Sequence, residues 1–324
     1  MNELLRRLLD LPPQGSTVAR GIDALHFTVI GTGVVVAAIA FALLVGFLVR
    51  YRESDPRPRP RRNTRRLEIG LSAVTLAAFL AWWGVGFAQY RTLRAVPANA
   101  LRVHVVAKQW MWQFVYPNGL AAETELRVPV GRPVELVLAS RDAIHSFFVP
   151  AFRIKEDAVP GRVTSMWFEA VAPGEYPILC AEYCGAGHSR MRGTVIALPA
   201  DEYARWIAAH PAPALAEAGA ALAETHGCLR CHTTDGRPSL GPTWRGLYDG
   251  PVALTGGAHA TADDAYLTEA MMDPAAKVVA GCAPIMPSYL GALDAADAAA
   301  IVEYIRSLGP PRAAAPPTAC TVTP

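Results

Sequence analysis

The chain has 324 residues, which is too long for one small domain and predicts two or three. Hydrophobic residues make up 52% of it and charged residues only 18%, a balance typical of a membrane-anchored protein rather than a wholly soluble one. The net charge is only +2, and no basic stretch alternates with aromatic residues in the way that binds nucleic acid, so a nucleic-acid partner is not expected.

Two apolar stretches occupy the N-terminal third, at residues 24–49 and 67–90. Each reaches the roughly 20 residues that a helix needs to cross a bilayer. The first is too long for the apolar core of a signal peptide, and no small-residue cleavage site follows it. We therefore predict two transmembrane helices in place of a cleaved leader.

The segment 50–66 between these stretches is strongly basic. Eight arginines stand against Glu53 and Asp55, which leaves a net charge of +6. Because positive loops stay in the cytoplasm, both chain termini are expected on the outer side of the membrane. This organisation predicts a two-helix anchor over 24–95, preceded by an N-terminal segment, 1–23.

From about Leu101 to Pro199 the pattern changes to short alternating runs such as LRVHVVAKQWMWQFVY, separated by Pro, Gly and Asn. Many short strands at this spacing predict a β-sandwich or barrel, which we place at 96–209. A segment rich in Ala and Pro at 210–213 then marks a boundary.

After that boundary the sequence becomes helical. Helical patterns precede Cys228 and begin at Asp263 and Asp294, and Asp294 is a favourable N-cap. We predict an all-α domain at 212–309 and an irregular, low-complexity tail at 310–324.

The chain has six cysteines, and four of them form two tight pairs, each followed by a histidine. That arrangement favours metal or cofactor chemistry over a disulfide framework. The remaining two, Cys282 and Cys320, can pair in an oxidising compartment, but their spacing alone leaves the question open.

The first pair lies in CAEYCGAGHSRM, where Cys180, Cys184, His188 and Met191 fall within twelve positions. Soft thiolates with imidazole and a thioether suit copper in electron transfer. Two cysteines four apart can bridge two copper ions, each of which then needs a histidine, and His145 is the natural second one. A Cys180–Cys184 disulfide and a structural zinc site are the alternatives.

The second pair is Cys228-Leu229-Arg230-Cys231-His232, the C-x-x-C-H pattern of covalent haem c attachment. The thiols add across the haem vinyl groups, and His232 becomes the proximal iron ligand. A thioredoxin-like redox pair is the alternative reading. For the distal ligand we expect a loop methionine and choose Met286, because Met271 and Met272 lie in a helical pattern that suits the core.

Residues 20–200 resemble subunit II of haem–copper oxidases throughout, in LPPQGSTVARGIDAL, QWMWQFVYPNG, HSFFVPAFRIKEDAVPGR and the cysteine loop. The resemblance implies a cupredoxin-like Greek-key β-barrel with the dinuclear copper centre called CuA. Its implied ligands are His145, Cys180, the backbone carbonyl of Glu182, Cys184, His188 and Met191.

Three further roles follow from the same resemblance. Trp110 matches the exposed tryptophan at which electrons enter. The alternative is that Trp110 is an aromatic residue of the β-barrel core. The Glu182 side chain matches a ligand to a magnesium ion shared with subunit I. Glu68 matches the glutamate at the mouth of a proton-uptake channel, although a carboxylate at a membrane edge is often merely interfacial.

Residues 212–309 resemble class I cytochrome c domains. In that family a proline carbonyl orients the proximal histidine, and Pro242 matches it. The resemblance also implies that the first helix, at Gly219 and Ala220, crosses the last one at Tyr304.

Oxidases whose second subunit carries a haem c form a bacterial class, the caa type, which this chain resembles. The implied function is subunit II of a membrane cytochrome c oxidase in the bacterial inner membrane. It takes electrons from cytochrome c or another membrane donor through haem c and CuA. Subunit I, which holds the oxygen site, then reduces O₂ to water and pumps protons. A nitric oxide reductase subunit and a copper-delivery protein are the rivals, and a quinol oxidase subunit is excluded because the copper ligands are complete.

Overall fold

The computed structural model forms two compact units, one of residues 1–14 with 18–95 and one of residues 15–17 with 96–324. The second unit contains both the β-rich and the helical domain, so the boundaries at 96–209 and 212–309 stay predictions. The described residues are 6, 9–51, 63–211, 214–313 and 320. Most of the arginine-rich segment, residues 212–213 of the expected boundary and most of the tail lie outside these residues.

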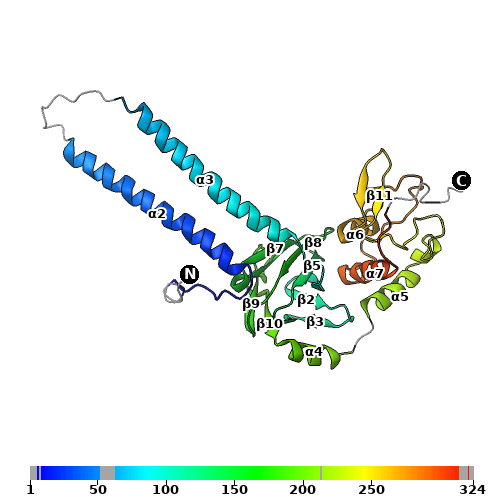
Figure 1. The fold of residues 1–324 in the computed structure, drawn as a ribbon. Coiled ribbons are helices and arrows are strands. Elements are labelled where there is room, and N and C mark those ends of the chain that lie inside the picture. Colours follow the sequence, from blue (N-terminus) through cyan, green and yellow to red (C-terminus); the bar gives the residue numbers. More distant parts are fainter. Residues whose placement is uncertain (1–5, 7–8, 52–62, 212–213, 314–319, 321–324) are drawn as a thin grey trace. The chain divides into compact units, whose positions relative to one another are not determined.

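In the first unit, α2 (Ala19–Arg50) and α3 (Arg65–Arg94) confirm the two predicted apolar helices and run as an antiparallel pair (Figure 1). They have 32 and 30 residues, which at about 1.5 Å per residue exceeds the roughly 30 Å hydrocarbon core of a bilayer. The most apolar window of each helix is wholly unburied. Length, composition and exposure therefore make both helices candidate membrane spans.

The β-rich part of the second unit has two five-stranded sheets, which confirms the predicted sandwich or barrel class. β1 pairs in parallel with β5, and β4 in parallel with β10, while the other neighbours are antiparallel. The first sheet, in spatial order, has β3 (Ala121–Glu123), β2 (Met111–Val115), β1 (Leu101–Lys108), β5 (Val134–Ser140) and β8 (Thr164–Phe168). The second has β4 (Glu125–Pro129), β10 (Arg192–Leu198), β9 (Gly174–Cys180), β6 (His145–Val149) and β7 (Ile154–Ala158).

Aromatic rings join the two sheets. Alternation along β2 buries Trp112 and Phe114 on one face, and both pack edge-on against Phe147 of β6, with ring centroids 5.2 and 6.3 Å away. All three side chains are fully buried. Edge-to-face rings of this size bring large apolar areas out of water, so they fix how β2 and β6 face each other.

The helical part contains α5 (Leu215–Thr225), α6 (Asp264–Met272) and α7 (Ala295–Ser307), and α4 (Ala200–Ala208) follows β10. The predicted cap is confirmed, because the Asp294 side chain accepts from the backbone of Ala296 and Asp297 in a capping box. A short hairpin of β11 (Pro251–Ala253) and β12 (His259–Thr261) departs from the all-α expectation.

Helix α5 crosses α7 at Gly219, but not against the aromatic residue expected there. A Cβ at Gly219 would lie 1.9 Å from the backbone oxygen of Ala300 and 3.0 Å from the nitrogen of Ile301. The predicted partner was therefore wrong, because the missing side chain admits the backbone of α7 itself. Tyr304 instead packs edge-on against Trp244.

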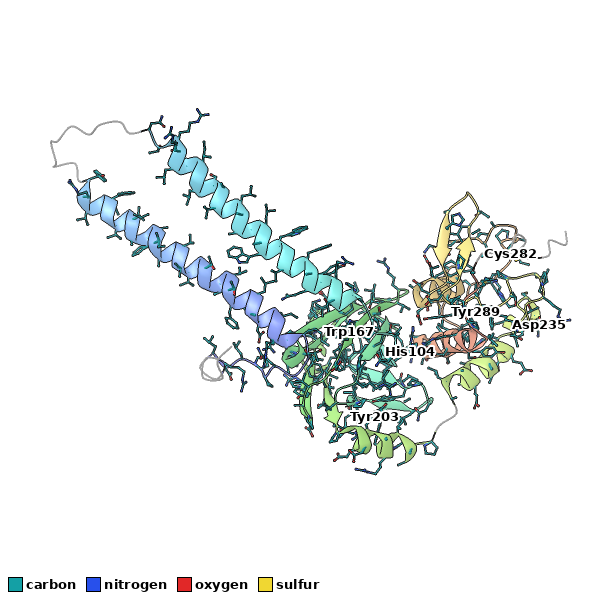
Figure 2. All side chains as sticks on the ribbon, in the orientation of Figure 1. His104, Trp167, Tyr203, Asp235, Cys282 and Tyr289 are labelled. Atoms are coloured by element: carbon teal, nitrogen blue, oxygen red, sulfur yellow. A yellow bond between two sulfur atoms is a disulfide. The ribbon has the colours of Figure 1, made fainter. Side chains whose placement is uncertain are left out.

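Within the second unit, Arg102 of β1 links the β-rich part to the helical part. Its side chain is only 11% exposed and forms ion pairs with Asp264 and Glu303, the latter at 3.3 Å. It also donates to the Tyr248 hydroxyl at 2.9 Å. His104, labelled in Figure 2, approaches Glu303 at 3.3 Å. A third carboxylate, Glu135 of β5, lies 3.6 Å from Arg102 within the β-rich part. Two of the three carboxylates around this nearly buried cation thus come from the helical part, which favours this packing of the two parts.

We expect Gly219→Ala to destabilise the helical part by about 1–3 kcal/mol, because the added methyl group collides with backbone that cannot rotate away. The measurement is thermal or denaturant unfolding of the full chain in detergent. Ala221→Ser, which adds one heavy atom on the exposed side of the same helix, is the control and should change stability by less than about 1 kcal/mol. Equal effects of the two substitutions would contradict the tight crossing.

Candidate functional site

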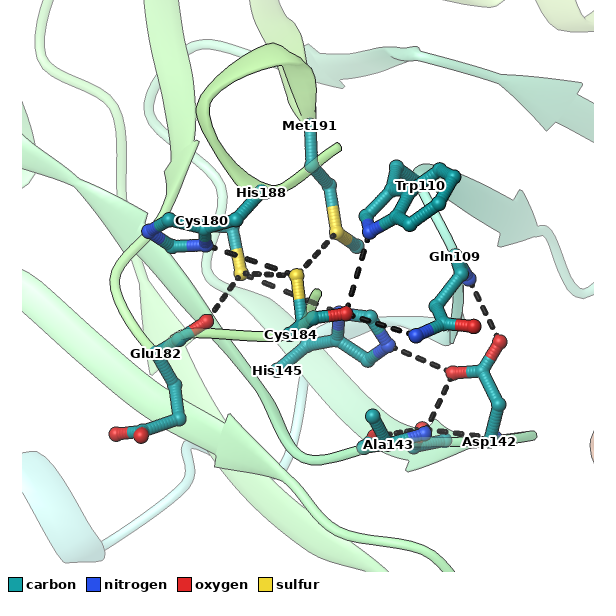
Figure 3. Close-up of polar contacts among 11 residues, drawn as sticks. Gln109, Trp110, Asp142, Ala143, His145, Cys180, Glu182, Cys184, His188 and Met191 are labelled. Atoms are coloured by element: carbon teal, nitrogen blue, oxygen red, sulfur yellow. Dashed lines mark hydrogen bonds and ion pairs between the residues drawn. The ribbon is translucent and has the colours of Figure 1, made fainter. Parts of the chain in front are cut away.

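Two free thiols lie side by side where β9 ends. Cys180 is the last residue of β9 and Cys184 follows in the loop that leads to the short helix η2 (His188–Arg190) and to β10. Their sulfur atoms are 3.8 Å apart (Figure 3). The disulfide alternative is therefore not formed in this structure.

The other predicted donors surround this sulfur pair. Nδ1 of His188 is 3.6 Å and Sδ of Met191 is 3.9 Å from the sulfur of Cys184. Nδ1 of His145 is 4.0 Å and the carbonyl oxygen of Glu182 is 3.2 Å from the sulfur of Cys180. The structure thus brings all six predicted donors together from the last residue of β9, the β9–β10 loop and the first residue of β6. A set of two thiols, two imidazoles and a thioether fits copper.

Asp142 orients His145, and sequence reasoning missed it. The His145 ring is fully buried, and its Nε2 lies 2.8 Å from the Asp142 carboxylate, which leaves Nδ1 toward the sulfurs. Burial opposes ionisation of Asp142, but hydrogen bonds from His145 and from the backbone N–H of Gln109 and Ala143 outweigh it and lower its pKa. The only signal for this role in the sequence was the position of Asp142, an acidic residue three positions before the predicted ligand His145.

Burial raises the pKa of the Cys184 thiol to about 11, and its contact with Cys180 adds to this. Without metal, the thiol is therefore protonated at neutral pH. Because a metal binds the thiolate, loading this site must release a proton.

Trp110 covers one side of the same loop. It is 39% exposed, whereas the neighbouring Trp112 is fully buried, so Trp112 is the core aromatic of this strand region. Nε1 of Trp110 donates to the Cys184 carbonyl oxygen at 3.2 Å. A Cβ at Gly187 would lie 2.3 Å from the Trp110 ring, so only glycine allows this packing.

The two carboxylates singled out from the sequence are both exposed. The Glu182 side chain lies in solvent, while its backbone carbonyl faces Cys180. Glu68 lies in the first turn of α3, where it accepts a hydrogen bond from the Thr64 hydroxyl at 2.5 Å.

A second candidate site is a cavity of about 470 Å³ in the helical part. It has the size of a typical cofactor pocket, and apolar side chains dominate its walls. The C-x-x-C-H motif lies at its wall, with Cys228 opening the short helix η3 (Cys228–Arg230). The lining residues include every predicted haem-binding residue: Cys228, Cys231, His232, Pro242 and Met286.

The His232 ring is held in one orientation. Its Nδ1 donates to the carbonyl oxygen of Pro242 at 2.8 Å, and the ring stacks on Trp244 with centroids 5.1 Å apart. A Cβ at Gly241 would lie 2.6 Å from the ring, so glycine is needed here too. Burial lowers the pKa of His232 and keeps the imidazole neutral, the form that coordinates iron. This apolar cavity with an oriented imidazole and two free thiols fits a covalently bound haem.

Both Met286 and Met271 line the cavity, so the cavity alone does not choose between them. Met271 belongs to α6 and is buried in the hydrophobic core, as expected. Met286 lies in the loop before α7. Three residues farther on, the backbone N–H of Tyr289 donates to the Met271 carbonyl at 2.9 Å and holds this loop against α6.

Cys282 and Cys320 form a disulfide, a question that the sequence left open. It joins the loop that carries Met286 to the C-terminal tail. Cys282, which is labelled in Figure 2, also lines the cavity.

Known families match both parts of the second unit. Residues 118–198 match "Cytochrome C oxidase subunit II, periplasmic domain", and residues 216–309 match "Cytochrome c". The chain is 30% identical over 318 residues to "Cytochrome c oxidase subunit 2" of Alkalihalophilus pseudofirmus, covering 93% of this chain and 91% of that one. It is 31% identical over 217 residues to "Alternative cytochrome c oxidase subunit 2" of Bradyrhizobium diazoefficiens, covering 57% and 78% of the two chains.

Among solved structures, the chain is similar to the periplasmic domain of subunit II of cytochrome oxidase (CoxB) of Bradyrhizobium japonicum. The two share 30% identity with a TM-score of 0.35, and the match covers 36% of this chain and 96% of that one.

We expect Asp142→Asn to lower copper affinity about 10–100-fold, because the amide no longer holds the His145 ring as the carboxylate does. The affinity is measured as the copper that each variant retains after dialysis against a series of chelators of increasing strength. Asp201→Asn removes only an exposed pair with Arg205 on α4 and should retain copper like the unmodified chain. Unchanged retention in Asp142→Asn would contradict the orienting role.

Proposed function

The chain belongs to the cytochrome c oxidase subunit 2 family, and on that basis we propose that it is the electron-accepting subunit of its complex, with haem c and dinuclear CuA as its redox groups. Members of this family act with other subunits in a haem–copper oxidase, an oxidoreductase. The observation that carries the proposal is the convergence of six copper-type donors in the same chain as a C-x-x-C-H cavity.

The copper centre would be held by six donors with distinct roles. Cys180 and Cys184 would hold both ions between them, since their sulfurs already lie 3.8 Å apart. His145 approaches Cys180 and His188 approaches Cys184, so each can complete the coordination of one ion. The Met191 thioether and the Glu182 carbonyl are the weak ligands. When bound, the copper pair supplies reversible one-electron chemistry with little rearrangement.

The haem would be attached by the other sequence motif. Cys228 and Cys231 would form the thioether links and His232 would bind the iron, while the Pro242 carbonyl fixes the orientation of the His232 ring. Met286 is the distal ligand that we propose, and a thioether in that position favours the reduced iron.

Electrons come from cytochrome c or another membrane donor and leave to subunit I, which reduces oxygen to water and pumps protons. Trp110, exposed and hydrogen-bonded to the Cys184 carbonyl, is the residue that we propose for electron transfer into the copper site. Because the haem domain and the copper domain are joined in one chain, each is at a high effective concentration near the other. Electron transfer from the haem to the copper site therefore needs no encounter between two separate proteins.

We propose that α2 and α3 cross the bacterial inner membrane with both termini on the periplasmic side, because the basic segment between them stays in the cytoplasm. Glu68, in the first turn of α3, is then near the cytoplasmic surface, where the mouth of a proton channel would lie. The exposed Glu182 carboxylate is free to reach a magnesium ion shared with subunit I. To test the first role, we expect the Glu68→Gln variant of the complex to lose proton pumping. To test the second, Mn²⁺ is substituted for magnesium, and we expect the Glu182→Gln variant to lose the bound Mn²⁺.

The full chain, purified in detergent with copper, should give an electron paramagnetic resonance signal in which one unpaired electron is shared by two copper nuclei. Cys184→Ser should abolish this pattern, since one bridge is gone, while the c-type haem absorption persists. Cys320→Ser is the control and should keep the copper signal. A single-copper signal in the unmodified chain would contradict the dinuclear site.

Met286→Ala should abolish the weak red absorption band of a sulfur–iron(III) bond and lower the haem midpoint potential. Met271→Ala should keep the band and instead cost about 2–5 kcal/mol of stability, because it empties a buried position. Optical spectra and redox titration of both variants separate the two candidates. Loss of the band in Met271→Ala alone would reverse the assignment.

A further inference from the structure

The chain just after α7 folds back onto the haem-binding part. The backbone N–H of Arg312 donates to the carbonyl oxygen of Gly246 at 3.0 Å. A Cβ at Gly246 would lie 2.9 Å from the oxygen of Pro310, and one at Gly250 would lie 3.3 Å from Cγ of Arg312. Two glycines thus leave room for the tail, and the Arg312 side chain passes directly over Gly250.

The Arg312 side chain has no partner among the described residues. Its Nε is buried and makes no hydrogen bond, and the guanidinium forms no ion pair with any described carboxylate. Arg312 also lines the 470 Å³ cavity, together with Cys228 and His232. Burial lowers the pKa of Arg312.

The cavity offers no anion from the described chain. The only other charged side chain on its wall is Lys277, which pairs with Glu269, and no aspartate or glutamate lines it. Arg312 as a whole is half-buried, but its Nε is out of water without a partner, which is costly, so a ligand that brings negative charge into the cavity would stabilise the arrangement. A planar carboxylate is the anion that a guanidinium binds best, through two parallel hydrogen bonds.

We propose that the tail supplies Arg312 to the cavity as the counter-ion of a haem propionate. The inference rests on the proposed haem c, whose two propionates are its only anionic groups. Arg312 lies beyond residues 216–309, the part matched by the cytochrome c family. Eight residues after Arg312, Cys320 is bonded to Cys282 on the cavity wall. The disulfide therefore holds the tail at a second point, C-terminal to Arg312.

The test compares Arg312→Gln, Arg312→Met and Arg312→Lys in the full chain in detergent. The readout is the haem midpoint potential, from optical redox titration at a series of pH values. At neutral pH, the Arg312→Gln and Arg312→Met variants should have a lower haem midpoint potential than the unmodified chain, because an uncompensated propionate stabilises the ferric iron. The potential of these two should rise again as pH falls through the pKa of the propionate. Lys, which restores the charge, should recover most of the original potential.

Arg205→Gln removes the same charge from a side chain that is 68% exposed on α4, and it should leave the curve unchanged. Curves for Arg312→Gln and Arg312→Met that coincide with those of the unmodified chain would overturn the proposal. If only one neutral variant folds, its curve decides. Failure of the unmodified chain to bind haem covalently would instead contradict the proposed function.

Discussion

The pairing register of β6 with β9 is the constraint on which the copper site depends. Phe147 lies opposite Cys180 in this pair, and His145 lies two residues from Phe147 on the same face. Because side chains alternate along a strand, a slip of one residue would turn His145 away from the sulfurs. The buried Phe147, held between Trp112 and Phe114, opposes such a slip. The same aromatic packing that closes the β-rich core therefore sets the position of a proposed ligand.

The two proposed cofactor sites achieve rigidity by similar local means. In each, a histidine uses one ring nitrogen for an oxygen acceptor, Asp142 for His145 and the Pro242 carbonyl for His232. In each, a glycine lets a neighbouring ring approach closely, Gly187 for Trp110 and Gly241 for His232. Preorganised ligands of this kind suit electron transfer, because little must move when the charge changes.

Short-range features were predictable from the sequence, and long-range ones were not. The cysteine loop and the C-x-x-C-H motif each fit within twelve residues, so spacing and ligand chemistry identified them. The Asp294 cap was equally local. By contrast, the Gly219–Ala300 contact and the Arg312–Gly246 contact join residues more than sixty positions apart. No periodicity encodes such pairs, because they depend on how whole helices and loops pack.

The crossing of α5 and α7 at Gly219 has a consequence for the origin of such chains. α5 is the first helix of the haem-binding part and α7 is the last, so their tight contact brings the beginning and the end of this part close together. A unit whose two ends meet can be joined to another protein without its interior being opened. This property makes the unit transferable between genes, as a complete module that needs only one point of attachment.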